Sequence, residues 1–263
     1  ERDVDHTRAG YGDTLNFNPN TRFGVQFDYG VAKNIDAVLI CTPTDMHADQ
    51  IELAAKAGKA IFCEKPVDLS ADRVRACLKV VEETGAKLMI GFNRRFDPSF
   101  AEVEKRIRRG DVGALEIVTV ISRDPNPPPP SYVKGSGGIF ADMMIHDFDM
   151  ARFLMGEEFV VVNALGAALV DKAIGEAGDV DTAAVQMQTA SGKIAVITNS
   201  RRATYGYDQR IEVHGSNGML RAANRTPTSV ELSSGTAIST DKPLYFFTER
   251  YQESYAAELD HFL

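Results

Sequence analysis

One stretch of the chain, residues 36–90, constrains the fold more than any other. In it three short apolar runs alternate with two segments that have the periodicity of amphipathic helices. The runs cover 37–41, 60–63 and 88–90, and the helical segments cover 44–57 and 70–84. Apolar runs this short are typical of strands that are buried on both faces. Their alternation with helices over short connections predicts parallel strands joined by right-handed crossovers, which is a doubly wound α/β layer.

After residue 96 the strands no longer alternate with helices. The segments that follow are a charged helix over 98–109, a strand over 115–122, a proline-rich loop over 125–130 and an apolar helix over 138–154. Five further β-type runs cover 159–170, 182–190, 193–202, 209–214 and 218–222, and a last helix covers 248–263. Consecutive runs joined by Gly-bearing turns are typical of antiparallel sheets. We therefore predict two domains, with the parallel layer in 1–96 and an α+β domain with an open, mainly antiparallel sheet in 97–263.

Charge and apolar content exclude several classes of function. The 263 residues carry a net charge of -8 and are 44% hydrophobic, which is ordinary for a soluble globular protein and argues against nucleic acid as a partner. No apolar run approaches the roughly 20 residues that span a bilayer, so no membrane contact is expected. Cys41, Cys63 and Cys77 lie in apolar runs without a CxxC pair, and no signal peptide precedes them. Reduced core thiols and a cytoplasmic location are expected.

Polar side chains follow all three predicted parallel strands. They are Thr42, Pro43 and His47 after the first strand, Glu64 and Lys65 after the second, and Asn93 and Arg94 after the third. The carboxyl ends of parallel strands lie at one edge of a sheet, and ligands bind there. The alternative is that turns are polar in any protein. That alternative fits Lys65 poorly, because this lysine directly follows a buried strand and precedes a proline, so we predict that it is functional.

The predicted helix over 138–154 carries three titratable residues on one face. Asp142, His146 and Asp149 are spaced i, i+4 and i+7, and at 100° per residue they fall within about 60° of one another. Asp147 lies well off that face. The remaining helix positions are apolar nearly all round, which predicts a buried helix. Buried carboxylates and imidazoles are costly unless they are paired or used in chemistry.

Three interpretations of this cluster are open. A metal site would need more ligands than one Asp and one His, and no second His or Cys cluster is evident, so we predict no metal. The second interpretation is a purely structural polar network. In the third, His146 accepts a proton, Asp142 orients or charges it, and Lys65 stabilises a developing alkoxide. Such a site would oxidise an alcohol, and it requires a cofactor because no side chain can accept the hydride.

Three ordered motifs together resemble the glucose–fructose oxidoreductase, inositol dehydrogenase and rhizopine catabolism (Gfo/Idh/MocA) family. The motifs are Cys41-Thr42-Pro43 with His47, Glu64-Lys65-Pro66, and the run from Gly138 to Asp149. The resemblance covers residues 36–263. The segments 91–97 and 199–210 are most similar to the inositol 2-dehydrogenase branch.

The resemblance implies a Rossmann-type NAD(P)-binding domain, with NAD or NADP as cofactor, and a C-terminal substrate domain whose open sheet forms a homodimer or homotetramer. It implies that Lys65, Asp142 and His146 are catalytic in oxidising a secondary hydroxyl of a cyclic polyol or sugar, with myo-inositol as the expected substrate. The residues expected to bind the cofactor are Thr42, Pro43, His47, Glu64, Lys65 and Arg94. Those expected to bind substrate are Lys65, Asn93, Asp142, His146, Asp149 and Tyr207, with Tyr251 as a further candidate.

One part of the family pattern is missing. Family members begin with a buried strand, a Gly-rich turn and an acidic residue, which bind the adenosine half of the dinucleotide. Here Gly10-Tyr11-Gly12 follows the charged segment 2–8 instead of a buried strand, and only Phe23, Val25 and Phe27 alternate as a strand would. An alternative function is therefore open: a non-catalytic, truncated family member that binds sugar or forms oligomers without holding the cofactor.

Overall fold

The computed structural model describes residues 35–263, and the chain divides into two compact units. The first unit ends at Gly91 and includes Phe262, and the second unit begins at Phe92. The predicted strand at 23–27 and the Gly10-Tyr11-Gly12 segment lie outside the described residues. Each unit has its own hydrophobic core.

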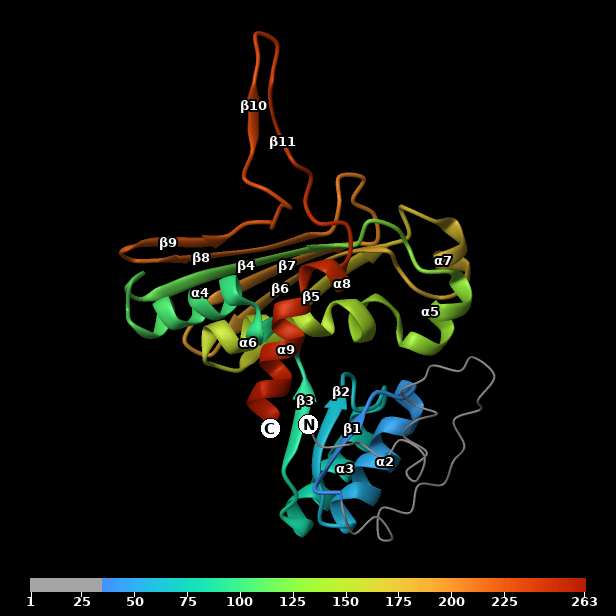
Figure 1. The fold of residues 1–263 in the computed structure, drawn as a ribbon. Helices are drawn as coiled ribbons and strands as arrows, with labels where there is room; N and C mark the ends of the chain where they lie inside the picture. Colours follow the sequence, from blue (N-terminus) through green and yellow to red (C-terminus); the bar gives the residue numbers. More distant parts are fainter. Residues whose placement is uncertain (1–34) are drawn as a thin grey trace. The chain divides into compact units, whose positions relative to one another are not determined.

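Within the described residues, the first unit is a parallel sheet of three strands in the order β1-β2-β3. The strands are β1 (Ala37–Ile40), β2 (Ala60–Glu64) and β3 (Leu88–Gly91). The helices α2 (Thr44–Lys56) and α3 (Ala71–Thr84) connect them and pack against each other (Figure 1). The predicted alternation of parallel strands and helices is confirmed.

Local sequence sets the limits of these helices. The Ser70 side chain accepts a hydrogen bond from the Arg73 amide at 3.4 Å and caps α3, and Gly85 ends α3 in the left-handed conformation with φ 66°. Helix α2 begins after Pro43, and no side chain among residues 35–263 caps it. Cys63 and Cys77 are buried as predicted, but Cys41 is exposed, because it follows the last residue of β1.

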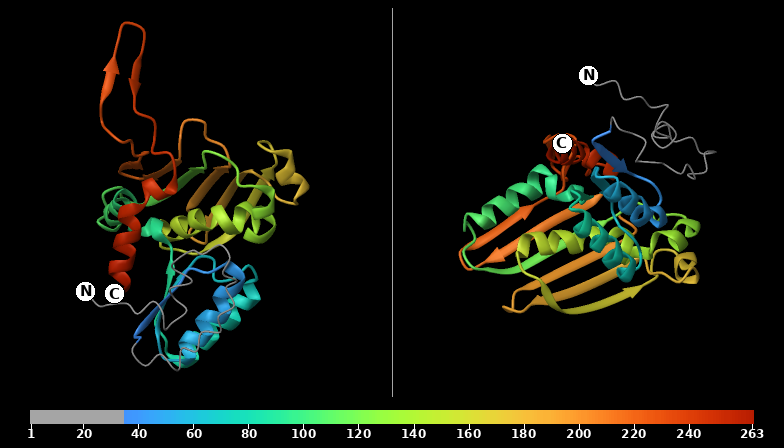
Figure 2. Two further views of the ribbon diagram at one scale, coloured as in Figure 1. Left: turned by 45° about the vertical axis from the view of Figure 1, so that its right-hand side comes forward. Right: turned by 90° about the horizontal axis from the view of Figure 1, so that it is seen from below.

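The second unit is built on six of the described strands, in the order β5-β6-β7-β4-β8-β9. They are β4 (Leu115–Arg123), β5 (Phe159–Ala167), β6 (Thr182–Thr189), β7 (Ile194–Ser200), β8 (Asp208–Gly215) and β9 (Gly218–Ala222). All neighbours are antiparallel except β4 and β7, which are parallel. Helices α4 (Pro98–Arg108) and α6 (Ile145–Met155) lie against one face (Figure 2). The prediction of an open, mainly antiparallel sheet is confirmed.

The prediction of one continuous α-helix over 138–154 is wrong. Residues Ile139–Met143 form a π-helical turn, and α6 begins only at Ile145. Asp142 therefore lies in the π turn, and the expected α-helical face with His146 and Asp149 is not continuous. A local backbone conformation and a tertiary hydrogen bond together account for the π turn. Gly138 has φ 76°, and the Asp179 carboxylate accepts the amide hydrogen of Ile139 at 3.0 Å.

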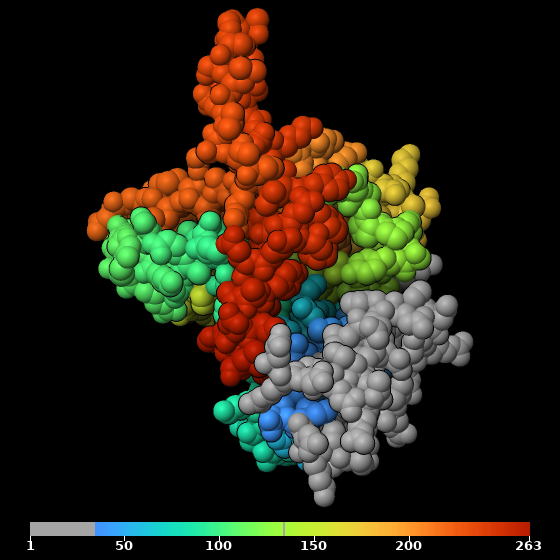
Figure 3. Space-filling view, in the orientation of Figure 1, coloured from blue at the N-terminus to red at the C-terminus, as the bar shows by residue number. Residues whose placement is uncertain are grey.

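Several short elements were not predicted. They are the 3-10 helix η1 (Asn93–Phe96), the helices α5 (Pro130–Ser136) and α7 (Lys172–Glu176), and the strands β10 (Glu231–Ser233) and β11 (Ile238–Thr240). The β10–β11 hairpin rises on the side of the six-stranded sheet away from α4 and α6, and Figure 3 shows it standing clear of the rest of its unit. The predicted C-terminal helix is present as α8 (Phe247–Arg250) and α9 (Gln252–Phe262). None of the described helices is long and apolar enough to cross a membrane.

Candidate active site

The predicted polar groups of the first unit do follow its strands. Lys65 comes directly after β2, and Thr42 comes shortly after β1. The Thr42 hydroxyl donates to Oε1 of Gln50 in α2 at 2.8 Å. Glu64, the last residue of β2, is largely buried, and this burial raises its pKa, while the charge of neighbouring Lys65 opposes the shift.

His47 joins two of these strand ends. It is 2% exposed, with Nδ1 2.7 Å from the Pro66 carbonyl oxygen and Nε2 2.7 Å from the Thr42 carbonyl oxygen. Carbonyl oxygens only accept, so each ring nitrogen faces an acceptor. The imidazole thus links the loop after β1 to the loop that carries Lys65. Sequence reasoning gave His47 a cofactor contact and missed this link.

In the second unit, Asp142 is held by two donors. The Tyr132 hydroxyl donates to Oδ1 at 3.0 Å, and Nη2 of Arg201 donates to Oδ2 at 3.0 Å. Nη1 of the same arginine donates to Oδ2 of Asp124 at 3.0 Å. Neither Tyr132 nor Arg201 was selected from the sequence. The one signal for Arg201 was its place in the segment 199–210, which resembles the inositol 2-dehydrogenase branch.

His146 lies four residues after Asp142, in the first turn of α6. Its half-buried ring meets the Phe92 ring edge to face, with 6.3 Å between the ring centroids. Asp149, one turn further, is 6% exposed and forms a two-pronged ion pair with Arg95, at 2.8 and 2.5 Å. A substrate hydroxyl at Asp149 would therefore share a carboxylate that already binds a guanidinium.

Asp147, which the periodicity places away from the reactive face, is the centre of a buried network. It accepts hydrogen bonds from the Ser122 hydroxyl at 2.5 Å and from Nδ2 of Asn199 at 2.8 Å, and it pairs with Arg94. The Ser122 oxygen also lies 3.0 Å from Oε1 of Gln209. Arg94, predicted to bind the cofactor, is thus only 4% exposed and engaged inside the second unit. Asn93 beside it is also buried.

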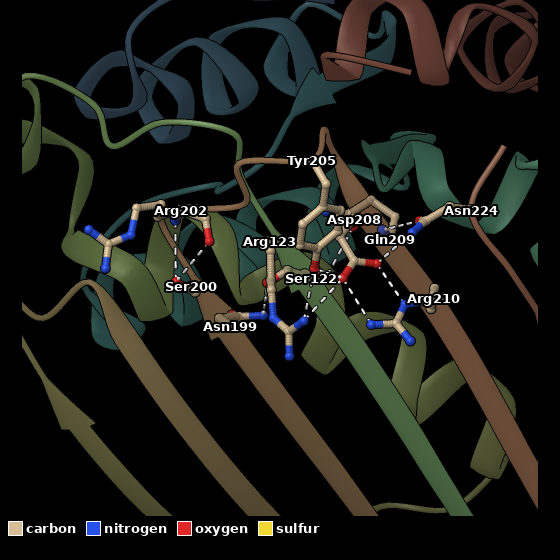
Figure 4. A network of polar contacts seen from close by, with 10 residues as sticks. All are labelled: Ser122, Arg123, Asn199, Ser200, Arg202, Tyr205, Asp208, Gln209, Arg210 and Asn224. Atoms are coloured by element: carbon tan, nitrogen blue, oxygen red, sulfur yellow. Dashed lines mark hydrogen bonds and ion pairs between the residues drawn. The ribbon is translucent and has the colours of Figure 1, made fainter. Parts of the chain in front are cut away.

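Tyr207 is buried, and its ring meets the Tyr251 ring edge to face at 6.0 Å. Burial raises the pKa of Tyr207 well above its usual range. The nearby Tyr205 is 38% exposed, and its hydroxyl donates to Asp208 at 2.5 Å (Figure 4). The sequence selected Tyr207 as a substrate candidate, but one sequence does not tell which of two neighbouring tyrosines is buried.

Asp208 itself collects several donors in Figure 4. Besides Tyr205, its carboxylate accepts from Arg210 at 2.7 and 2.9 Å, from Asn224 at 2.7 Å and from Arg123 at 3.2 Å. Burial alone would raise the pKa of Asp208, but these hydrogen bonds lower it below its usual value. The network joins the starts and ends of several strands and is structural in character.

Comparison with known proteins assigns the chain to a family. The model of an oxidoreductase family with an NAD-binding Rossmann fold matches residues 25–92, and the model of the GFO/IDH/MocA C-terminal domain matches residues 100–221. This chain belongs to the Gfo/Idh/MocA oxidoreductase family. The resemblance predicted from the motifs is confirmed.

Individual family members are similar over most of the chain. The inositol 2-dehydrogenase of Rhizobium meliloti is 64% identical over 88% of this chain and 70% of its own length. The myo-inositol 2-dehydrogenase of Thermotoga maritima is 48% identical over 88% of this chain and 69% of its own. The structure of scyllo-inositol dehydrogenase from Lactobacillus casei with NAD(H) and scyllo-inositol is 32% identical, with a TM-score of 0.81, over 89% of this chain and 71% of that one.

The first unit fits the nicotinamide cofactor of the family. Its parallel strands end at one edge of the sheet, where dinucleotides bind in open α/β folds. At this edge α2 begins without a side-chain cap from the described residues, which suits the approach of a polar or anionic ligand group to its first amides. In the part of the chain from 35 to 263, no group of three His, Cys, Asp or Glu side chains could hold a metal ion.

Proposed function

We propose that this chain is an NAD-dependent dehydrogenase that oxidises a secondary hydroxyl of inositol. The observation that carries the proposal is the 64% identity to an inositol 2-dehydrogenase over 88% of the chain. The donors that hold the Asp142 carboxylate, four residues before His146, support the same chemistry. No comparison favours the alternative of a non-catalytic relative.

Three residues would carry the reaction. We propose that His146 takes the proton of the substrate hydroxyl, that Asp142 orients it, and that Lys65 stabilises the negative charge that develops on the oxygen. Lys65 belongs to the first unit, and Asp142 and His146 belong to the second. NAD, when bound, supplies the hydride acceptor.

The proposal extends to the other residues predicted to contact the cofactor or the substrate. Thr42, Pro43, Glu64 and Lys65 at the strand ends would line the nicotinamide half of the cofactor. His47 and Arg94 would support cofactor binding indirectly, each within its own unit, because their polar atoms already bind protein groups. Asn93, Asp149 and Tyr207 remain candidates for the substrate side.

We also propose that the open face of the six-stranded sheet in the second domain, 97–263, forms a homodimer or homotetramer. A row of residues in register crosses this face: Val161, Gln188, Ile194, Ile117, His214 and Met219. Its four large apolar members are exposed, from 38% for Ile194 to 52% for Val161. A flat apolar row of this kind is typical of a subunit interface. Analytical ultracentrifugation of Ile194→Asp should show smaller species than the parent chain.

The cytoplasm is the proposed location, because an odd number of cysteines in apolar runs without a CxxC pair is typical of reduced thiols. Incubation of the chain with NAD and myo-inositol, with NADH followed by absorbance, tests the function. Calorimetric titration with NAD tests the cofactor separately. Turnover of inositol is expected. The proposal is wrong if neither myo- nor scyllo-inositol yields NADH and NAD at millimolar concentration gives no heat of binding. That outcome would support the non-catalytic alternative.

A further inference from the structure

Arg201 stands between two carboxylates at the end of β7. Nη2 donates to Asp142 and Nη1 to Asp124, each at 3.0 Å, and the backbone amide of Arg201 donates to the Asp181 carbonyl oxygen at 2.8 Å. The Arg201 side chain is 6% exposed, and those of Asp142 and Asp124 are 15% and 18% exposed. Such short, shielded ion pairs are stronger and more directional than surface ones.

The two carboxylates keep Arg201 charged. Burial would lower the pKa of this guanidinium, but Asp124 and Asp142 together raise it above its usual value. Burial raises the pKa of Asp124, and Arg201 opposes that shift. One positive charge is therefore shared by two anions, and Asp124 fixes the arginine from the side away from Asp142.

Tyr132 completes the arrangement on the other oxygen of Asp142. Burial, together with the charge of Asp142, raises the pKa of the Tyr132 phenol to about 12, so the hydroxyl remains a proton donor at any working pH. Asp142 thus receives one donor on each oxygen, at 3.0 Å in both cases. Donors on both oxygens restrict the rotation of the Asp142 carboxyl group.

We infer that Arg201 is a positioning residue that fixes the orientation of the Asp142 carboxyl group, with Tyr132 as its partner and Asp124 as its anchor. The inference rests on the proposed function and deepens it. The sequence predicts that Asp142 orients or charges His146. A carboxylate held by a donor on each oxygen keeps a fixed orientation, as a group that orients the imidazole must.

A double-mutant cycle between Arg201 and Asp142 tests this role. Arg201→Met should lower kcat by about 10²-fold, the loss expected when a reacting group is displaced by about 1 Å. The inositol KM and the NAD affinity should change by less than about threefold, because Arg201 acts through Asp142. In the Asp142→Asn background the same change should cost less than about threefold, because the group it positions is already altered. Arg201→Lys, which keeps the charge but not the fork, should recover part of the loss.

Matched controls separate positioning from general damage. Arg202→Met makes the same chemical change one residue further on, at an exposed side chain, and should stay within about twofold of the parent kcat. Asp124→Asn leaves the Arg201 and Asp142 side chains unchanged but removes the negative charge that anchors Arg201. It should lower kcat several-fold in the parent background and should have no such effect in the Asp142→Asn background. This variant carries the test if Arg201→Met does not fold.

Equal losses of kcat in the two backgrounds would overturn the inference, as would an Asp124→Asn variant with unchanged kcat. These outcomes differ from a failure of the proposed function. In that case the parent chain itself would turn over no inositol, and the cycle would show no kcat to lose.

Discussion

The two units hold their candidate residues in different ways. In the first unit, the strand ends and backbone carbonyls do so: Lys65 follows β2, and His47 bonds to the carbonyl oxygens of Thr42 and Pro66. In the second unit, charged side chains do so: Asp142 is held by Arg201, Asp147 by Arg94 and Asp149 by Arg95. The difference predicts which substitutions should affect catalysis alone and which should also affect stability. A side chain at a strand end should be replaceable with little loss of stability, whereas replacing one member of a buried ion pair should cost stability as well.

The largest effect is expected at Lys65, and it should be confined to catalysis. Lys65→Met should lower kcat by about 10³-fold, equivalent to ~4 kcal/mol of lost transition-state stabilisation. The free energy of unfolding, measured by urea denaturation, should change by less than about 1 kcal/mol. A Lys65→Met chain with near-normal turnover would remove Lys65 from the reaction. One that is strongly destabilised would break the contrast between the units.

Arg94 should show the opposite behaviour. Arg94→Met leaves the Asp147 carboxylate buried without its guanidinium, and loss of one partner of a buried pair costs about 3 kcal/mol or more. Urea denaturation should show the loss directly. Arg75→Met is the control, because Arg75 pairs with Asp72 on the surface of α3 and should lose under about 1 kcal/mol. Equal effects of the two changes would mean that burial does not decide the cost.

Gly138 tests how the second unit shapes the turn that carries Asp142. A methyl group at Gly138 would lie 2.5 Å from Oδ1 of Asp179, and φ is 76°. Gly138→Ala should therefore cost about 2 kcal/mol and lower kcat as well. Gly178→Ala is matched, since φ is 89° but, apart from its chain neighbours, no atom of residues 35–263 lies within 4 Å of the added methyl group, so only backbone strain remains. If both variants lose the same stability and activity, the contact with Asp179 is not what fixes the turn.

The smallest expected effects concern the pH dependence of stability. This dependence should have opposite signs for Glu64 in the first unit and Asp208 in the second. The pKa of Glu64 is raised from 4.5, so its contribution to stability falls as pH rises from 4.5 through the raised value. The pKa of Asp208 is lowered from 3.8, so its contribution is present above 3.8 and is lost as pH falls through the lowered value. Relative to the parent chain, Glu64→Gln should gain stability at neutral pH, and Asp208→Asn should lose stability there. Urea midpoints across the acid range that move in the same direction for both would contradict the assignment.

Much of the first unit could be predicted because its signals are local. The apolar runs of β1, β2 and β3, the Ser70 cap and the Gly85 terminus each occupy a few consecutive residues. The motif at Glu64-Lys65-Pro66 likewise indicated a functional strand end without any knowledge of distant residues. For the second unit, the strands of the large sheet were predicted, but the parallel pairing of β4 with β7 was not.

Local sequence patterns were enough to predict the α/β layer, the mainly antiparallel second sheet and the family, and to select Lys65, Asp142 and His146 as candidates. Each of these follows from short patterns that repeat along neighbouring positions. The burial of Arg94 and the hydrogen bonds of Tyr132 and Arg201 to Asp142 are visible only in the folded chain, and the π turn at Asp142 depends on the distant Asp179 as well as on Gly138. The reason is physical: Arg201 lies 59 residues from Asp142, and Asp179 lies 40 residues from Ile139. An ion pair or hydrogen bond between such distant positions leaves no periodic trace, and only the folded chain brings the two groups together.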